Sequence, residues 1–358
     1  MTTTATSPLH AEHVAAGATF DPSGSPMPLW YNAPEAVAAE YESAREAAAM
    51  VELAEHGVLA VTGPDRQKFL NAMLSNDILG RRPGEGCRAA LMDVKGRLAV
   101  LVRALIAEDT VWLEMPARRM EPVEGLLRHY KVAAPVRFQA TPMTILGVLG
   151  PHARQHLGHA GLDVPDLAPE AHASVALGTH ALRVAPAGDL PASGYVLHVL
   201  PEAAPDVWRA LLGAGVRPLG RHALDVLRVE EGQAWYGPDV SEDNLLHETG
   251  LVGACHSSTK GCYLGQEVVA RLEARGGKVS QALRGLRLDR PVTAGTAVFA
   301  GDEQVGRVTT AGVSPRLGAV ALAYVHRKHF EAGTNLQVGP ARAQVQLLPL
   351  AAAGAAGE

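Results

Sequence analysis

The chain has 358 residues, 47% of them hydrophobic and 19% charged, so it can bury a sizeable core in two or three domains. A formal net charge of -5 provides no basic face for duplex nucleic acid, and direct nucleic-acid binding is not expected. Three cysteines are too sparse for a secreted disulfide framework and no apolar run reaches membrane-spanning length, so we expect a cytoplasmic protein without a membrane partner.

The two ends of the chain lack a sustained hydrophobic period, and we expect flexible tails over 1–29 and 351–358. Between them, a first α+β unit is predicted from alternating strand and helix patterns. Its elements are a helix over 33–53, a strand over 57–62, a helix from Asp65, strands over 87–92 and 98–105 around a Lys95-Gly96 turn, a strand over 110–115, a helix over 118–130 and a strand over 134–139.

A second α+β unit follows, with a strand at 145–150, a helix after Pro151, strands near 175–184 and 195–200, and a helix over 203–214. From Leu283 the chain changes to short β-type runs separated by Gly and Pro, which indicates a small all-β domain. We therefore place two α+β units within 30–281 and a C-terminal β-barrel domain within 282–350.

The segment Lys260-Gly261-Cys262-Tyr263-Leu264-Gly265-Gln266-Glu267 is the most informative motif. Its two glycines permit a tight loop, and residues 266–275 are expected to form a helix that Gly276 ends. Cys262 would then lie just before a helix start, where the helix dipole and nearby basic side chains favour a reactive thiol. The alternative is that Cys262 is a small buried hydrophobic residue, which is the commoner fate of a free cysteine.

No metal site is expected. Cys255, His256 and Cys262 could suggest one, but no compact second pair of ligands follows them.

The string K-G-C-Y-x-G-Q-E at 260–267 resembles the signature of YgfZ-like folate-binding proteins, which are similar to the glycine-cleavage T protein. Further segments that look like this superfamily extend the resemblance from about residue 30 to about 348. They are 150–153, 228–232 with 236–239, and 305–309 with Ser314-Pro315.

The resemblance implies an α+β, T-protein-like ring of three domains around a folate channel, with the C-terminal domain a β-barrel. It implies tetrahydrofolate, in an unknown one-carbon state, as the cofactor. It also implies that Glu230 binds the pterin ring, because a carboxylate can accept two parallel N–H bonds from the ring edge. The other residues that we expect at the site are Arg228, Tyr236, Lys260 and Arg271 for folate and Cys262 as the functional thiol.

For function, the resemblance implies a tetrahydrofolate-binding protein, expected to be a monomer, that supports iron–sulfur cluster assembly or repair. Its partners would be iron–sulfur proteins, including tRNA-modifying enzymes, or their assembly machinery. The alternative is a folate-dependent aminomethyltransferase of the T-protein type. T protein carries paired aspartates where this chain has Ala99 and Val100, and neither residue can act as an acid or base. We therefore favour the first function on the sequence, and leave open whether the protein is an enzyme.

Overall fold

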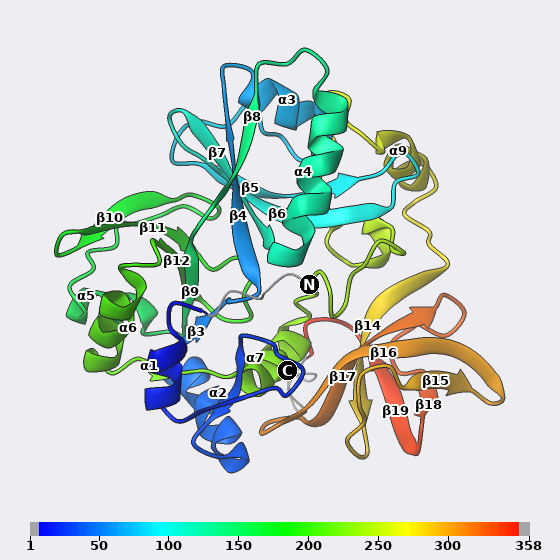
Figure 1. The fold of residues 1–358 in the computed structure, drawn as a ribbon. Coiled ribbons are helices and arrows are strands. Elements are labelled where there is room, and N and C mark those ends of the chain that lie inside the picture. The colour runs from blue at the N-terminus through cyan, green and yellow to red at the C-terminus, as the bar shows by residue number, and fades with distance from the viewer. Residues whose placement is uncertain (1–6, 351–358) are drawn as a thin grey trace.

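The computed structural model describes residues 7–350 and shows three lobes around the centre of the molecule (Figure 1). The first lobe is a five-stranded sheet in the order β5-β6-β7-β4-β8. Its elements are β4 (His56–Thr62), α3 (Arg66–Met73), β5 (Gly86–Met92), β6 (Leu98–Ile106), β7 (Thr110–Pro116), α4 (Ala117–Lys131) and β8 (Arg137–Thr141).

The predicted hairpin of the first lobe is confirmed. β5 and β6 pair antiparallel, and the amide of Gly96 donates to the carbonyl of Asp93 over 3.0 Å to close the turn. Gly96 has a φ of +71°, a conformation that glycine adopts without strain.

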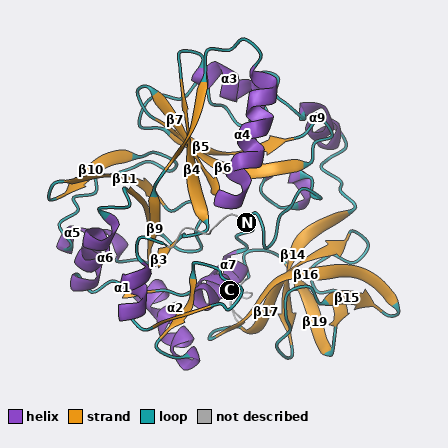
Figure 2. Ribbon diagram, in the orientation of Figure 1, coloured by secondary structure: helices purple, strands orange, loops and turns teal. Residues whose placement is uncertain are grey.

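The second lobe is a six-stranded sheet in the order β10-β11-β12-β9-β3-β13, and Figure 2 shows its helices α5 and α6 together on one side of it. Its strands are β3 (Ala49–Glu52), β9 (Thr144–Leu149), β10 (Ala173–Leu177), β11 (His180–Pro186), β12 (Gly194–Val199) and β13 (Arg217–Pro218). Its helices are α2 (Val37–Glu46), α5 (Ala153–His159) and α6 (Ala204–Gly213), with the 3-10 turn η1 (Pro34–Ala36) before α2.

The helix predicted over 33–53 is too long. It ends at Glu46, and residues 49–52 form β3, in which all four positions are buried. The apolar run Ala49-Met50-Val51 suits a strand buried on both faces, and Glu52 at its end is buried together with its partner His13.

The N-terminal segment is not a loose tail over its described part. It forms α1 (His10–Ala15), β1 (Ala18–Phe20) and β2 (Pro28–Tyr31). His13 is fully buried, and its Nε2 lies 2.7 Å from the Glu52 carboxylate of β3. This buried pair fixes the segment to the second lobe. Residues 1–6 and the predicted tail at 351–358 lie outside the described residues.

The third lobe is a closed barrel in the order β14-β17-β16-β15-β18-β19. Its strands are β14 (Gln281–Leu288), β15 (Ala297–Ala300), β16 (Glu303–Ser314), β17 (Gly318–His326), β18 (Asn335–Val338) and β19 (Ala341–Gln346). The predicted α+β fold class with a C-terminal barrel is confirmed.

One segment links the second lobe to the barrel, and it carries most of the sequence motifs. It consists of α7 (Arg221–Glu231), η2 (Leu246–Glu248), α8 (Val252–Cys255) and α9 (Gln266–Ala274). Helix α7 lies near the centre of the ring and packs against β16 of the barrel (Figure 1). Within the described part of the chain, no helix is both long enough and apolar enough to cross a bilayer.

Candidate functional site

Three adjoining cavities lie at the junction of the lobes. The innermost has a volume of about 60 Å³ and is lined by the first sheet, by Asp189 of the β11–β12 connection and by the segment after α7. A cavity of about 490 Å³ shares His56, Pro116, Trp235 and Tyr236 with it, and one of about 610 Å³ shares Gln233. The shared residues show that each of the two larger cavities adjoins the inner one.

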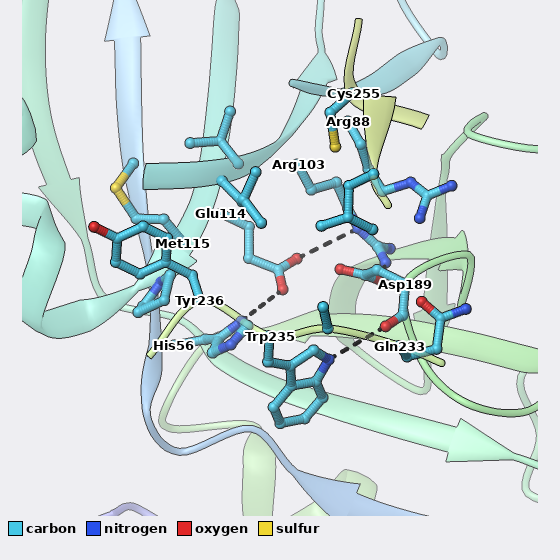
Figure 3. Close-up of a pocket in the computed structure, with 15 residues that line it drawn as sticks. His56, Arg88, Arg103, Glu114, Met115, Asp189, Gln233, Trp235, Tyr236 and Cys255 are labelled. Carbon is cyan, nitrogen blue, oxygen red and sulfur yellow. Dashed lines mark hydrogen bonds and ion pairs between the residues drawn. The ribbon is translucent and has the colours of Figure 1, made fainter. Parts of the chain in front are cut away.

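A buried carboxylate forms the core of the inner cavity. Glu114 of β7 stands directly opposite Arg103 of β6 in the antiparallel ladder and is 3% exposed. Its Oε1 lies 3.1 Å from His56 Nδ1, and its Oε2 lies 2.8 Å from His198 Nε2. Figure 3 shows the carboxylate pointing toward His56 and Arg103.

The environment of Glu114 favours its ionised form. Burial opposes ionisation, but the charge of Arg103 and the hydrogen bonds from the two histidines outweigh it. The pKa of Glu114 therefore lies well below its usual range, and the carboxylate keeps its negative charge at neutral pH.

Arg103 ties the cluster to the second lobe. Its guanidinium forms an ion pair with Asp189 and donates to the carbonyl of Pro186 over 3.1 Å. Because β6 belongs to the first lobe and Asp189 follows β11, the charged cluster spans the junction of two lobes. A cluster of this kind depends on how the lobes are assembled.

An aromatic wall faces the charged cluster. Trp235 and Tyr236 follow α7, and the indole N–H of Trp235 donates to the Asp189 carbonyl over 3.3 Å. Behind Trp235, the fully buried Arg228 guanidinium lies 4.6 Å from its ring centroid. Arg228 is also paired with Asp239 over 2.7 Å, so the wall has a rigid support.

Of the six residues predicted for the site, Tyr236 lines the inner cavity and Arg228 supports it from behind. Glu230 does neither. Its carboxylate accepts hydrogen bonds from the Tyr41 hydroxyl at 2.9 and 3.0 Å and is paired with Arg45. The structure thus gives Glu230 partners inside the chain, one of which, Arg45, lines the 610 Å³ cavity, and its role in pterin binding stays a prediction.

The 260–267 segment is also placed away from the cavities. The half-buried ammonium of Lys260 donates to the carbonyls of Asn71, Leu74 and Asn76 at the end of α3. Burial lowers the pKa of Lys260 to about 8. Lys260 therefore fastens the loop to the end of α3.

Cys262 and Arg271 are both exposed, and Arg271 pairs with Glu267 over 2.5 Å on the surface of α9. The exposed position of Cys262 contradicts the alternative that it is a packed hydrophobic residue. Neither residue lines the inner cavity. Within the described residues, no group of three or more His, Cys, Asp or Glu side chains could hold a metal ion.

The sequence did not lead us to the residues that build the cavity. The available signal was a charged residue inside an apolar strand, since such residues are rarely buried without a partner. Arg103 within 98–105 and Glu114 within 110–115 both show it. The residues missed are His56, Arg103, Glu114, Asp189, His198 and Trp235.

Curated relatives of this chain include several proteins named aminomethyltransferase. The one from Rubrobacter xylanophilus is 29% identical over 89% of this chain and 86% of its own. The one from Streptomyces coelicolor is 31% identical over 91% of both chains. A putative chloroplastic transferase from Arabidopsis thaliana is 27% identical over 81% of this chain and 68% of its own.

These names correct the functional prediction. We expected a role in iron–sulfur cluster assembly or repair. The relatives that match this chain along most of their length are named aminomethyltransferase, and this contradicts the expectation. The aminomethyltransferase alternative fits these findings better. The predicted tetrahydrofolate cofactor agrees with the aminomethyltransferase relatives, so the cofactor prediction is retained.

The solved glycine-cleavage aminomethyltransferase T from Bartonella henselae matches 97% of this chain and 98% of its own, with a TM-score of 0.87 at 25% identity. Residues 9–259 match the model of the GCVT N-terminal domain, and 281–350 match the model of the glycine cleavage T-protein C-terminal barrel domain. The chain therefore belongs to the glycine-cleavage T-protein family.

Proposed function

We propose that this protein is a folate-dependent aminomethyltransferase, which transfers a one-carbon unit from an aminomethyl donor to tetrahydrofolate in the central cavities. The observation that carries the proposal is the meeting of the aromatic wall, Trp235 and Tyr236, with the buried cluster of Arg103, Glu114 and Asp189. Cavities at domain junctions that combine apolar walls with a few buried polar groups are the usual sites for small ligands.

The residues present fit a folate. Its flat ring suits the face of Trp235, and the Asp189 carboxylate and Gln233 amide offer hydrogen-bond partners to the ring edge. The inner cavity alone, at about 60 Å³, would hold only part of a folate, and the two larger cavities that adjoin it offer room for the rest. When bound, the folate supplies nitrogen atoms that carry the one-carbon unit.

The anionic tail of the folate would meet Arg118 at the opening of the 490 Å³ cavity. Among the described residues, no carboxylate lies within ion-pair distance of Arg118. A Cβ on Gly237 would lie 2.1 Å from Arg118 Nη2, so the glycine leaves room for the guanidinium against the wall. Arg221, on the same cavity, is already paired with Glu55 and Asp225.

Two finer assignments belong to this proposal. The 260–267 string supports a place close to YgfZ-like folate-binding proteins within the family. A reducing, cytoplasmic environment is supported by Cys87, Cys255 and Cys262, all of which are unpaired thiols.

The test is a binding and transfer experiment on the full chain. Calorimetry under anaerobic conditions should show tetrahydrofolate binding, and Trp235→Ala should weaken it about tenfold or more through loss of the stacking surface. Trp30→Ala serves as the control, because Trp30 contacts His222 outside the three cavities. Formation of methylenetetrahydrofolate and ammonia from an aminomethylated carrier protein is the activity assay. Wild-type protein that binds no reduced folate would overturn the proposal.

A further inference from the structure

We infer that His56, held by Glu114, is the proton-transfer residue of the reaction, an inference that rests on the proposed function. His56 begins β4 and lines both the inner cavity and the 490 Å³ cavity. Its side chain is 19% exposed, and its Nδ1 is bound to Glu114. Its Nε2 has no hydrogen-bond partner among the described residues, so this nitrogen is available to a ligand.

The pairing with Glu114 sets the chemical state of the ring. An ionised carboxylate can only accept a hydrogen bond, so Nδ1 must carry the proton that it donates. In the neutral ring Nε2 is then the acceptor, which is the form that a general base needs. The low pKa of Glu114 keeps the carboxylate charged, so it remains the acceptor of the Nδ1–H bond and holds the ring in this orientation.

His198 provides an internal contrast. It bonds the other oxygen of the same carboxylate over 2.8 Å, but its side chain is completely buried and lines none of the three cavities. One histidine therefore completes the hydrogen bonding of Glu114, and the other presents the paired ring to the cavity. A purely structural role for the cluster would not require His56 to reach the cavity.

Several charged groups surround His56. The Trp235 ring lies 5.8 Å from its ring, and the charged side chains that share its two cavities come from different elements. They are Arg88, Arg103, Glu114 and Asp189 in the inner cavity and Glu55, Arg118 and Arg221 in the 490 Å³ cavity.

The proposed step is a balanced proton transfer. As the acceptor nitrogen forms its bond to the donor carbon, it loses one proton to His56 Nε2. The carbon–nitrogen bond of the aminomethyl group breaks, and Nε2 returns that proton to the leaving amine, which departs as ammonia. The electron pair of the broken bond stays with the ammonia. The transfer is complete when the second folate nitrogen bonds the same carbon and the bond from that carbon to the carrier breaks. The electron pair of that bond and the proton of the second nitrogen go to the carrier atom, and the oxidation level of the carbon does not change. This supplies the acid–base group that Ala99 and Val100 cannot provide.

The decisive variant is His56→Asn. Its amide can still donate to Glu114, but it has no equivalent of Nε2. We expect kcat to fall about 100-fold, the acidic limb of the kcat–pH profile to disappear, and the folate dissociation constant to change by less than about twofold. His129→Gln, at an exposed position of α4, is the matched control and should match wild type.

Glu114 is a positioning residue in this scheme. Glu114→Gln should lower kcat with little change in KM and should move the pH profile, which a merely structural change would not do. If this variant does not fold, His56→Asn alone decides. In folate-free wild-type protein, nitrogen NMR should show the neutral ring of His56 protonated on Nδ1.

The outcomes separate the two proposals. Transfer by wild type with His56→Asn retaining kcat within about threefold overturns the role of His56 and leaves the proposed function intact. A neutral His56 ring protonated on Nε2 also overturns it. Absence of both folate binding and transfer in wild type overturns the proposed function and the role of His56 together.

Discussion

Replacing Arg228 by Met tests how far the central wall depends on this buried guanidinium, which pairs with Asp225 as well as with Asp239. The side chains of Arg228 and Asp239 are both completely buried, and their 2.7 Å bond connects α7 with the segment that carries Trp235. Asp239 also accepts bonds from Thr309 and Thr310 of β16 at 2.7 and 2.6 Å, so the same carboxylate reaches the barrel. The pair thus joins the site to the third lobe.

Removing one partner of a buried ion pair usually costs about 3 to 5 kcal/mol, because the other charge is left without compensation. In Arg228→Met the threonine hydroxyls and the Trp235 amide still donate to Asp239. We therefore expect the free energy of unfolding to fall by about 3 kcal/mol, near the lower limit of this range. Asp239→Asn should couple with it, so that the double variant is less destabilised than the sum of the two single variants by about 1 to 3 kcal/mol.

Urea unfolding followed by circular dichroism measures these free energies. Arg128→Met is the control, because Arg128 forms an exposed pair with Glu124 on α4 and should cost less than about 0.5 kcal/mol. Folate affinity of folded Arg228→Met should also fall, since Trp235 loses the cation behind it. A loss of stability below about 1 kcal/mol, or strict additivity with Asp239→Asn, would refute the reasoning.

Three further predictions follow from single sites. Arg118→Gln should weaken tetrahydrofolate binding about tenfold in calorimetry and leave a tetrahydropterin without a tail unaffected; equal losses would remove Arg118 from the tail site. Burial, assisted by Arg183, lowers the pKa of His172 to about 4 in the folded chain. Between pH 6.5 and 4 the unfolded state therefore binds more protons than the folded state does. The free energy of unfolding should fall by about 2 kcal/mol from pH 8 to pH 5. In urea titrations this fall should be smaller for His172→Gln. Cys262 should react rapidly with a thiol reagent at neutral pH because it is exposed, whereas Cys87 and Cys255 should react slowly because burial raises the pKa of each to about 12; equal rates would contradict the assigned exposures.

The parts of the fold that the sequence predicts well are those set by local rules. The turn at Lys95-Gly96 and the helix start after Gly265 depend on a few neighbouring residues, and both are present in the structure. The error over 33–53 has a local cause too. The run Ala47-Ala48-Ala49 suits a helix on propensity alone, and pairing of β3 with β9 overrides that preference.

The site is predicted poorly because its parts come from distant positions. His56, Arg103, Glu114, Asp189 and Trp235 lie on five separate segments, and no short motif contains two of them. The motif segments lead to residues that hold the scaffold together. Lys260 bonds three carbonyls at the end of α3, and Arg228 supports an aromatic ring from behind.

The site keeps a carboxylate although residues 99 and 100 are not acids, and the pairing of β6 with β7 explains why. Val100 is fully buried in the core of the first lobe and presents nothing to the cavity. Farther along β6, Arg103 does line the cavity, and its direct partner on β7 is Glu114. Because opposite residues of an antiparallel pair point to the same face, a charged group can come from either strand and still reach the same space. Matching positions one by one with T protein therefore underestimates the number of acid–base groups available here. For this reason the residues at 99 and 100 favoured, wrongly, a function other than aminomethyl transfer.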